Sequence, residues 1–303
     1  MLLVLSSLAF ATQLDMRTEG CPTGNGVARV YSKVSANTHG GWDSDLVSYS
    51  TEGQFREYAI STCPDDLFTV YGHDMDMVLT DEQKTAVEVT LAGLRREIED
   101  PEKLEVWERY IIAGQVYKTL GADHRQLYQL YLEASWTARD KAVGVYKGLE
   151  GPIAAWELLE QGDAELKRTD LDAHTRKILL HNLARVAHRG GFANRRDGYL
   201  KQFEAVGDLD AEEKKALQTM RWIVTDVEPK LQQLAMAELQ AYLATEPSDT
   251  VELMRATYLL ADLYRRQGDM GVAVQGYALV AVHPDAPQQL KDLSAWFGSM
   301  LSQ

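Results

Sequence analysis

Two cysteines carry the most distinctive chemistry in this sequence. Cys21 and Cys63 are its only cysteines, and two thiols can form a disulfide, exchange electrons or ligate a metal. The first eleven residues are apolar and close on Ala9-Phe10-Ala11, a pattern typical of a signal peptide, although a buried N-terminal strand is the alternative. In an exported chain an even number of cysteines favours a disulfide, which the chain-entropy model credits with about 4 kcal/mol of stability.

A mixed metal site is the competing use of these thiols. It would recruit oxygen and nitrogen ligands from His39, Asp65, Asp66 and His73. Their residue types suit zinc, but their spacing matches no standard zinc pattern. The acidic pairs Asp43/Asp45 and Asp74/Asp76 could bind calcium, yet they lack the remaining ligands and the glycine of an EF-hand, which favours turn or capping roles. The sequence therefore predicts no bound metal and no cofactor.

Basic side chains gather around the Gly190-Gly191 turn in an otherwise acidic chain. They could form a docking patch for an acidic peptide or for a phosphate-bearing envelope polymer. The alternative is a helix C-terminus, whose dipole favours cations, followed by a solvated turn. The pair Arg265-Arg266, later in the chain, has the same two interpretations. The candidate partner-binding residues are Arg185, Arg189, Arg195, Arg196, Arg265 and Arg266.

No familiar catalytic motif accompanies these residues. The seven histidines form no H-E-x-x-H pattern, and neither a G-x-S-x-G elbow nor a phosphate-binding loop is present. Gly24-Asn25-Gly26 lacks the third glycine of a dinucleotide fingerprint. Five tryptophans lie in helical segments, where helix packing is the usual explanation for aromatic side chains; they are Trp107, Trp136, Trp156, Trp222 and Trp296. The sequence predicts a protein that is not an enzyme.

Composition and net charge limit the classes of molecule that this protein is expected to bind. The chain has 303 residues and a formal net charge of -14, which repels nucleic acids and anionic lipid surfaces. No stretch approaches the roughly 18 to 20 apolar residues that a membrane-spanning helix needs. A protein or peptide partner is expected, with no nucleic acid and no membrane span.

The elements that must position these side chains change type near residue 79. Short apolar runs at 27–31 and 55–60, bounded by turn residues, predict strands. Thr80 is a candidate N-cap, and the apolar spacing beyond it is helical. Helical hairpins are predicted around Gly121, around Gly190-Gly191 and around Gly268, with a spacer over 148–172 that makes the array irregular.

The third hairpin matches the tetratricopeptide pattern best. Tyr264 is the large residue of its first helix, Gly268 follows four residues later, and Tyr277 follows thirteen residues later. Small residues at Ala261 and Ala273 would let the two helix backbones approach. The sequence therefore predicts a mainly α protein, in which a tetratricopeptide-like array of helical hairpins follows a small N-terminal β module.

Short matches spread over the chain resemble the bacterial family called domain of unknown function 2225. They include Cys21-Pro22, the run 43–46, Cys63-Pro64 and the helical segments 131–139 and 260–268. The resemblance implies a zinc ribbon with two C-P-x-C knuckles, followed by tetratricopeptide-like helices. Gly24 and Asp66 stand where the second cysteine of each knuckle is expected, so two of the four zinc thiolates are missing. A ribbon would still bring Cys21 and Cys63 together, and a disulfide can replace the metal in an oxidising compartment.

These observations predict three segments and a binding role. Residues 1–11 are a signal peptide, 12–79 a degenerate zinc ribbon, and 80–303 the helical domain. We expect a periplasmic or secreted scaffold that binds a protein or peptide through its helical array. The alternatives are a metal-binding or thiol-redox module built on Cys21 and Cys63, and an envelope enzyme with an unrecognised site.

Overall fold

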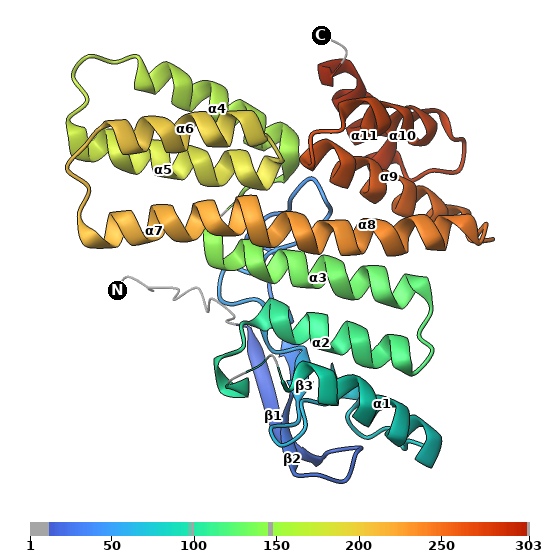
Figure 1. The fold of residues 1–303 in the computed structure, drawn as a ribbon. Helices are drawn as coiled ribbons and strands as arrows, with labels where there is room; N and C mark the ends of the chain where they lie inside the picture. Colours follow the sequence, from blue (N-terminus) through green and yellow to red (C-terminus); the bar gives the residue numbers. More distant parts are fainter. Residues whose placement is uncertain (1–11, 97, 99, 145–147, 302–303) are drawn as a thin grey trace, which may run out of the picture. The chain divides into compact units, whose positions relative to one another are not determined.

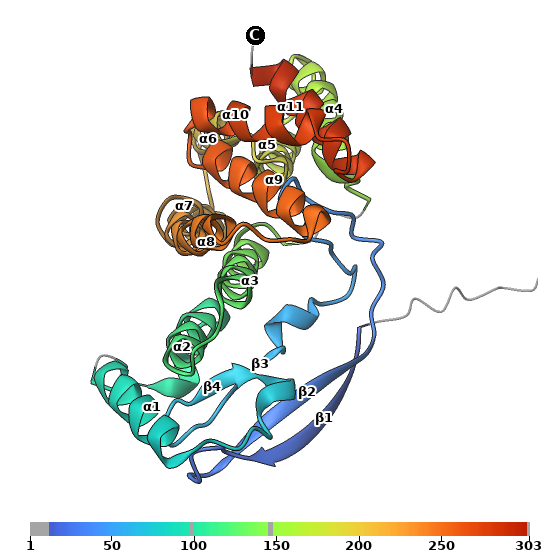
Figure 2. The same ribbon diagram turned by 90° about the vertical axis from the view of Figure 1, so that its right-hand side faces the viewer.

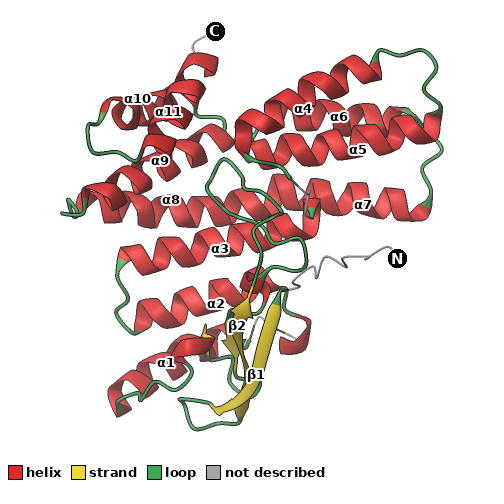
Figure 3. Ribbon diagram, turned by 180° about the vertical axis from the view of Figure 1, so that it is seen from behind, coloured by secondary structure: helices red, strands yellow, loops and turns green. Residues whose placement is uncertain are grey.

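The computed structural model describes residues 12–96, 98, 100–144 and 148–301. The expected signal peptide, residues 1–11, lies outside this part of the chain. Helices form most of the described chain, and the short strands lie in its N-terminal part, as Figure 3 shows. The prediction of a mainly α protein with a small N-terminal β module is confirmed.

The chain forms two compact units, and their limits follow contacts rather than sequence order. Of the described residues, those within 12–41 and 48–120 form unit 1, and those within 42–47 and 121–301 form unit 2. Unit 2 thus takes a short segment from the N-terminal part of the chain. The first two α-helices, which the sequence groups with the later helices, pack within unit 1.

Unit 1 is built from two antiparallel strand pairs and two helices. Strand β1 (Gln13–Gly20) pairs with β2 (Val27–Ser35), and β3 (Ile60–Thr62) pairs with β4 (Thr69–Tyr71). Figure 2 shows β1 and β2 as a long two-stranded ribbon. The strand expected over 55–60 is wrong for its first part, because Phe55–Glu57 is a 3-10 helix and the strand begins at Ile60.

Helices α1 (Asp81–Leu94) and α2 (Val106–Thr119) complete unit 1. Thr80 is the N-cap of α1, as predicted: its hydroxyl accepts from the Gln83 N–H at 3.2 Å, and the Gln83 side chain accepts in return from the Thr80 N–H at 3.0 Å. This reciprocal pair satisfies two N–H groups that a helix start leaves unpaired. The α2 helix packs against β3 and β4, and its Tyr110 is fully buried.

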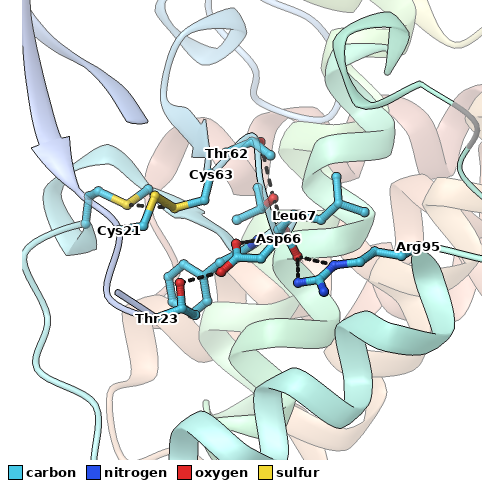
Figure 4. The surroundings of a disulfide bond; sticks show 10 residues. Cys21, Thr23, Thr62, Cys63, Asp66, Leu67 and Arg95 are labelled. Atoms are coloured by element: carbon cyan, nitrogen blue, oxygen red, sulfur yellow. Dashed lines mark hydrogen bonds between the residues drawn. A yellow bond between two sulfur atoms is a disulfide. The ribbon is translucent and has the colours of Figure 1, made fainter. Parts of the chain in front are cut away.

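The predicted disulfide joins Cys21 and Cys63 within unit 1, with their Cα atoms 6.0 Å apart. Figure 4 shows its surroundings. Each cysteine begins a tight turn: the Gly24 N–H donates to the Cys21 carbonyl at 2.8 Å, and the Leu67 N–H donates to the Cys63 carbonyl at 3.0 Å. Both cysteines are buried, so the bond ties the end of β1 to the β3–β4 turn from inside the unit.

Unit 2 consists of the acidic segment 42–47 and the remaining helices. Figure 1 shows α4, α5 and α6 side by side, and α9, α10 and α11 grouped together. The helix bounds are α3 His124–Val143, α4 Gly151–Leu166, α5 Ala173–Gly190, α6 Ala193–Ala205, α7 Ala211–Trp222, α8 Glu228–Ala244, α9 Thr250–Arg266, α10 Met270–Val282 and α11 Gln288–Leu301. The expected spacer over 148–172 contains α4, which packs against α5.

The hairpins predicted around Gly190-Gly191 and Gly268 are the pairs α5–α6 and α9–α10. Gly191 and Gly268 have φ angles of 75° and 89°, the left-handed region that favours glycine at the end of a helix. Gly276 of α10 lies against Ala261 of α9, and a Cβ added at Gly276 would stand 2.7 Å from the Ala261 Cβ. Gly276 and Ala261 therefore set the close approach of these two helices; Ala261 is one of the two small residues expected there, and the other, Ala273, is fully buried.

The third expected hairpin, around Gly121, has its first helix α2 in unit 1 and its second helix α3 in unit 2. Within unit 2, α3 packs mainly against α8. The α7 and α8 helices are joined by the π-helical segment Ile223–Val227. Such wide turns shift the side chains that follow them, and Glu228 comes directly after this one.

The tryptophans divide between core and surface. Trp107 is buried in α2, and Trp156 and Trp296 pack against the apolar core of unit 2. Trp222 is 48% exposed, so its assignment to a core is wrong. Among the described residues, no helix is both long and apolar enough to cross a bilayer.

Candidate functional site

The segment 42–47 buries three polar side chains in unit 2. Its turn closes when the Leu46 N–H donates to the Asp43 carbonyl at 2.9 Å, with Leu46 in the left-handed region at φ 67°. The Trp42 N–H donates to the Leu149 carbonyl at 2.9 Å, which fixes the start of the segment. Asp43, Ser44 and Asp45 are each at most 1% exposed. We refer to Asp43–Leu46 as the acidic turn.

Arg139 of α3 connects the acidic turn to α8. Its guanidinium lies 3.0 Å from Asp43 Oδ2, 2.6 Å from Asp45 Oδ2 and 2.7 Å from Glu228 Oε1. Each of these four side chains is at most 1% exposed. Burying a charged side chain away from water costs free energy unless the charge is paired and hydrogen-bonded. The bonds from Arg139 to the three carboxylates provide this pairing. Arg139 therefore holds α3, α8 and the acidic turn together.

Arginines of α5 and α9 extend this network. Arg189 Nε donates to Asp43 Oδ1 at 2.5 Å. Arg265 and Arg266 both bind Asp262 of their own helix, at 2.5 Å and 2.9 Å. Ser44 links the two parts, because its hydroxyl accepts from Arg266 Nη2 at 2.6 Å and donates to Asp262 Oδ2 at 3.0 Å. The acidic turn thus reaches α3, α5, α8 and α9 through ionic contacts.

His188 links α5 to Glu228 at the edge of the network. Its Nε2 lies 2.6 Å from Glu228 Oε2, and its Nδ1 lies 3.2 Å from Arg196 Nη1. Arginine can only donate, so Nδ1 must accept and the proton sits on Nε2. Burial lowers the pKa of His188 more than the Glu228 carboxylate raises it, which keeps the imidazole neutral.

Three carboxylates of the network, those of Asp45, Glu228 and Asp262, have lowered pKa values and are ionised. Burial alone raises the pKa of Glu228 and of Asp45, but Arg139 together with further cations and hydrogen bonds holds both pKa values below their ordinary range. The pKa of Asp262 is likewise lowered, because Arg265 and Arg266 outweigh burial. Burial also raises the pKa of Tyr258 and Tyr277 well above the ordinary value, so both hydroxyls stay protonated.

Two neighbouring cavities open beside the network. The polar cavity has a volume of about 30 Å³, and the apolar cavity about 250 Å³. Gly191, Ala193 and Arg266 line both of them. The walls of the apolar cavity come from α4, the α5–α6 turn, the α9–α10 turn and α11; its large side chains are those of Trp156, Phe192, Met270, Met300 and Leu301.

The six arginines predicted to bind a partner have different surroundings. Arg189, Arg265 and Arg266 are buried within the network, and Arg196 lies at its edge. Arg195 stands apart: it pairs with Glu160 at 2.7 Å and with Asp163, and it covers the Trp156 ring. Arg185 binds the Val143 carbonyl and the Asn182 side chain. Most of these guanidinium groups hold helices together.

The candidate metal ligands of unit 1 are spread over separate contacts. The Asp66 carboxylate accepts from the Thr23 hydroxyl and from the Phe68 N–H at 2.9 Å, and its backbone carbonyl accepts from Arg95 (Figure 4). His73 stacks on Tyr71, and Asp74 accepts from the Tyr117 hydroxyl. Within the described ranges, no three His, Cys, Asp or Glu side chains are grouped as metal ligands would be.

Sequence inspection missed Arg139, His188 as a buried group, Glu228 and Asp262. A usable signal was present for Arg139, which falls three residues after Trp136, seven after Leu132 and four before Val143, on a largely apolar helix face. Asp262 likewise falls three residues after Leu259 and four after Tyr258, which are both apolar or aromatic. Comparisons with protein-family models, with curated proteins and with solved structures gave no match.

Proposed function

We propose that this protein is an exported, non-enzymatic scaffold whose helical array binds a peptide segment of a protein partner. The apolar cavity of unit 2 carries this proposal. Its volume of about 250 Å³ is below the roughly 300 to 1,000 Å³ of most small-molecule sites. It suits one large apolar side chain, and burying such a side chain stabilises a complex by about 1.5 to 3 kcal/mol.

The buried charges favour binding over catalysis. Asp43, Asp45, Glu228 and Asp262 all accept hydrogen bonds from arginines, which hold the helices around them. A general acid or base needs a pKa near the working pH. The pKa values of Asp45, Glu228 and Asp262 are instead lowered, which suits permanent ion pairs.

Export is supported by the disulfide, because such bonds persist in oxidising compartments. A periplasmic or secreted location is therefore part of the proposal. Membership of the domain of unknown function 2225 family is supported by the two turns that begin at Cys21 and Cys63. Both sulfurs are buried, and thiol exchange requires access, which favours a structural bond over a redox module.

A display library of random peptides, selected against residues 12–303, tests the binding role. We expect enrichment of peptides with one large apolar anchor. Met270 lines the cavity and is 41% exposed, so Met270→Asp places a charge in the cavity wall without disturbing the core. This variant is expected to weaken binding of an enriched peptide about tenfold, or by about 1.4 kcal/mol in calorimetry.

Val272→Asp is the matched control. Val272 lies on the same helix at 39% exposure and is not among the residues lining the cavity. The Val272→Asp variant should bind the enriched peptide as tightly as the unmodified chain does. Absence of enrichment, or equal losses in the two variants, would refute a binding role for this cavity.

A further inference from the structure

The polar cavity of unit 2 presents hydrogen-bond donors. Its polar lining residues are His188, Arg196, Glu228, Gln232 and Arg266, and the rest of its wall comes from Gly191, Ala193, Val224 and Pro229. Its volume of about 30 Å³ holds about two water molecules, given roughly 10 to 15 Å³ for each in this measure. Such a space accepts a group of three or so heavy atoms, so a carboxylate fits better than a tetrahedral phosphate.

Arg196 is the key donor in this cavity. The residue is only 8% exposed. Its Nε donates to Asp197 at 2.7 Å and its Nη1 to His188 Nδ1 at 3.2 Å. Its Nη2 has no hydrogen-bond partner among residues 12–96, 98, 100–144 and 148–301. Solvent reaches this atom, so it is a charged donor that an anion entering the cavity can use in place of water.

The charges around the cavity leave a positive excess. Four arginines of the network, Arg139, Arg189, Arg265 and Arg266, are matched by the four carboxylates Asp43, Asp45, Glu228 and Asp262. Arg196 is additional, and the side chain of its own partner Asp197 is 57% exposed to solvent. Water screens an exposed charge, so Asp197 neutralises Arg196 only weakly.

Glu228 also lines the cavity, but its charge is already engaged. Its Oε1 accepts from Arg139 at 2.7 Å and from Gln232 at 2.9 Å, and its Oε2 accepts from neutral His188. The helix α6 begins at Ala193, and its N-cap Phe192 offers no side-chain acceptor. The first N–H groups of α6 therefore add positive dipole to the same cavity.

We infer that this cavity binds a carboxylate, and that the carboxylate belongs to an acidic residue next to the apolar anchor of the partner peptide. The second part rests on the proposed function. Gly191, Ala193 and Arg266 line both cavities, so neighbouring side chains of one peptide can enter them together. The binding motif is then a pair of one large apolar residue and one Glu or Asp.

Acetate tests the cavity alone. In heteronuclear NMR spectra of residues 12–303, millimolar acetate should shift the amide signals of Ala193 and Arg196. Arg196→Gln should abolish this shift, whereas Arg196→Lys should retain part of it. Arg221→Gln is the control, because Arg221 pairs with Glu204 on the outside of α7. No shift, or an equal shift in Arg196→Gln, would overturn the carboxylate site.

Ala193→Asp provides a second test that does not depend on the folding of Arg196→Gln. A carboxylate at the first position of α6 would act as an internal ligand. We expect a higher melting temperature and no response to acetate. A lower melting temperature together with a normal acetate response would contradict the site.

Two blocked dipeptides test the peptide motif. N-acetyl-Phe-Glu-amide should bind about tenfold more tightly than N-acetyl-Phe-Gln-amide, and this preference should vanish in Arg196→Gln. Met270→Asp should weaken both dipeptides and leave the acetate shift unchanged. Equal binding of the two dipeptides, with acetate still bound, would overturn the motif and show a site for free small carboxylates. The peptide selection described above would be unaffected by either result.

Discussion

Arg139 contacts three buried carboxylates, from the acidic turn and from α8, at 3.0, 2.6 and 2.7 Å. Removing one partner of a buried ion pair leaves an uncompensated charge, which costs about 3 to 5 kcal/mol. We therefore expect Arg139→Met to lower the free energy of unfolding by that amount in urea titrations. Arg168→Met is the control, because the Arg168 side chain is 52% exposed, and it should change stability little. Equal stability of the two variants would show that the network is not stabilising.

His188 makes stability depend on pH. Its pKa is lowered by burial, which outweighs Glu228 of α8, while Arg196 of α6 and Arg139 of α3 also lower it. The unfolded chain binds a proton near pH 6.5 and the folded chain does not, so stability is complete above about pH 6.5 and falls below it. One such proton gives a slope of at most about 1.4 kcal/mol per pH unit.

We expect urea titrations between about pH 7 and pH 5.5 to show this loss, and His188→Gln to reduce it. The pKa of His181 is also lowered, by burial and then by Arg185, so part of the slope should survive in the His188 variant. His181→Gln is the matched comparison. A slope unchanged by His188→Gln would exclude a neutral buried His188.

The partners of the network were beyond the reach of sequence reasoning because they lie far apart along the chain. Arg189 and Asp43 are separated by 146 positions, and Ser44 and Asp262 by 218. The cluster at 185–196 was visible in the sequence, but charge alone cannot tell an exposed patch from a buried network. Only a charged residue on an apolar helix face, such as Arg139, gives a local signal of burial.

At the scale of elements, periodic apolar spacing and glycine turns predicted α5–α6 and α9–α10 well. Trp156 was expected in a helical segment, but the packing of α4 against α5 was not predicted, because α4 begins with Gly151-Pro152 and contains Gly162, residues that indicate a break. Proline is nevertheless compatible with the first turn of a helix. Strand β1 was not predicted, because its residues are mostly polar and exposed and show no alternation of apolar and polar side chains.

The Cys21–Cys63 bond links the two strand pairs of unit 1, which also pack on each other through β2 and β3. In the part of the chain that the structure describes, each sheet has two strands, and isolated strand pairs are marginally stable in water. We expect the double variant Cys21→Ser/Cys63→Ser to lose about 4 kcal/mol, and to lose hydrogen-exchange protection at the β1–β4 amides. Because both sulfurs are buried, the unmodified chain should match it only after unfolding and refolding in the presence of a reductant. Full protection in either sample would mean that the bond is dispensable.

At the scale of the whole molecule, the path of the chain decides which residues must fold together. Residues 42–47 belong to unit 2, whereas the residues on both sides of them belong to unit 1. The arginines of α3 and α5 meet their carboxylates only when this segment is in place. A domain boundary drawn at a change of sequence pattern near residue 79 therefore omits a part that unit 2 needs.

Asp43→Asn/Asp45→Asn in the full chain tests this dependence, because it keeps the shape of the turn and removes its charges. Arg139 and Arg189 would then be buried with too few carboxylates, so we expect α3, α5 and α8 to lose hydrogen-exchange protection. The β1–β4 amides of unit 1 should keep theirs. Asp285→Asn/Asp292→Asn removes the same charge from exposed positions and should leave both units protected. If α3 and α5 exchanged as slowly in the first variant as in the second, unit 2 would be complete without the charges of the acidic turn.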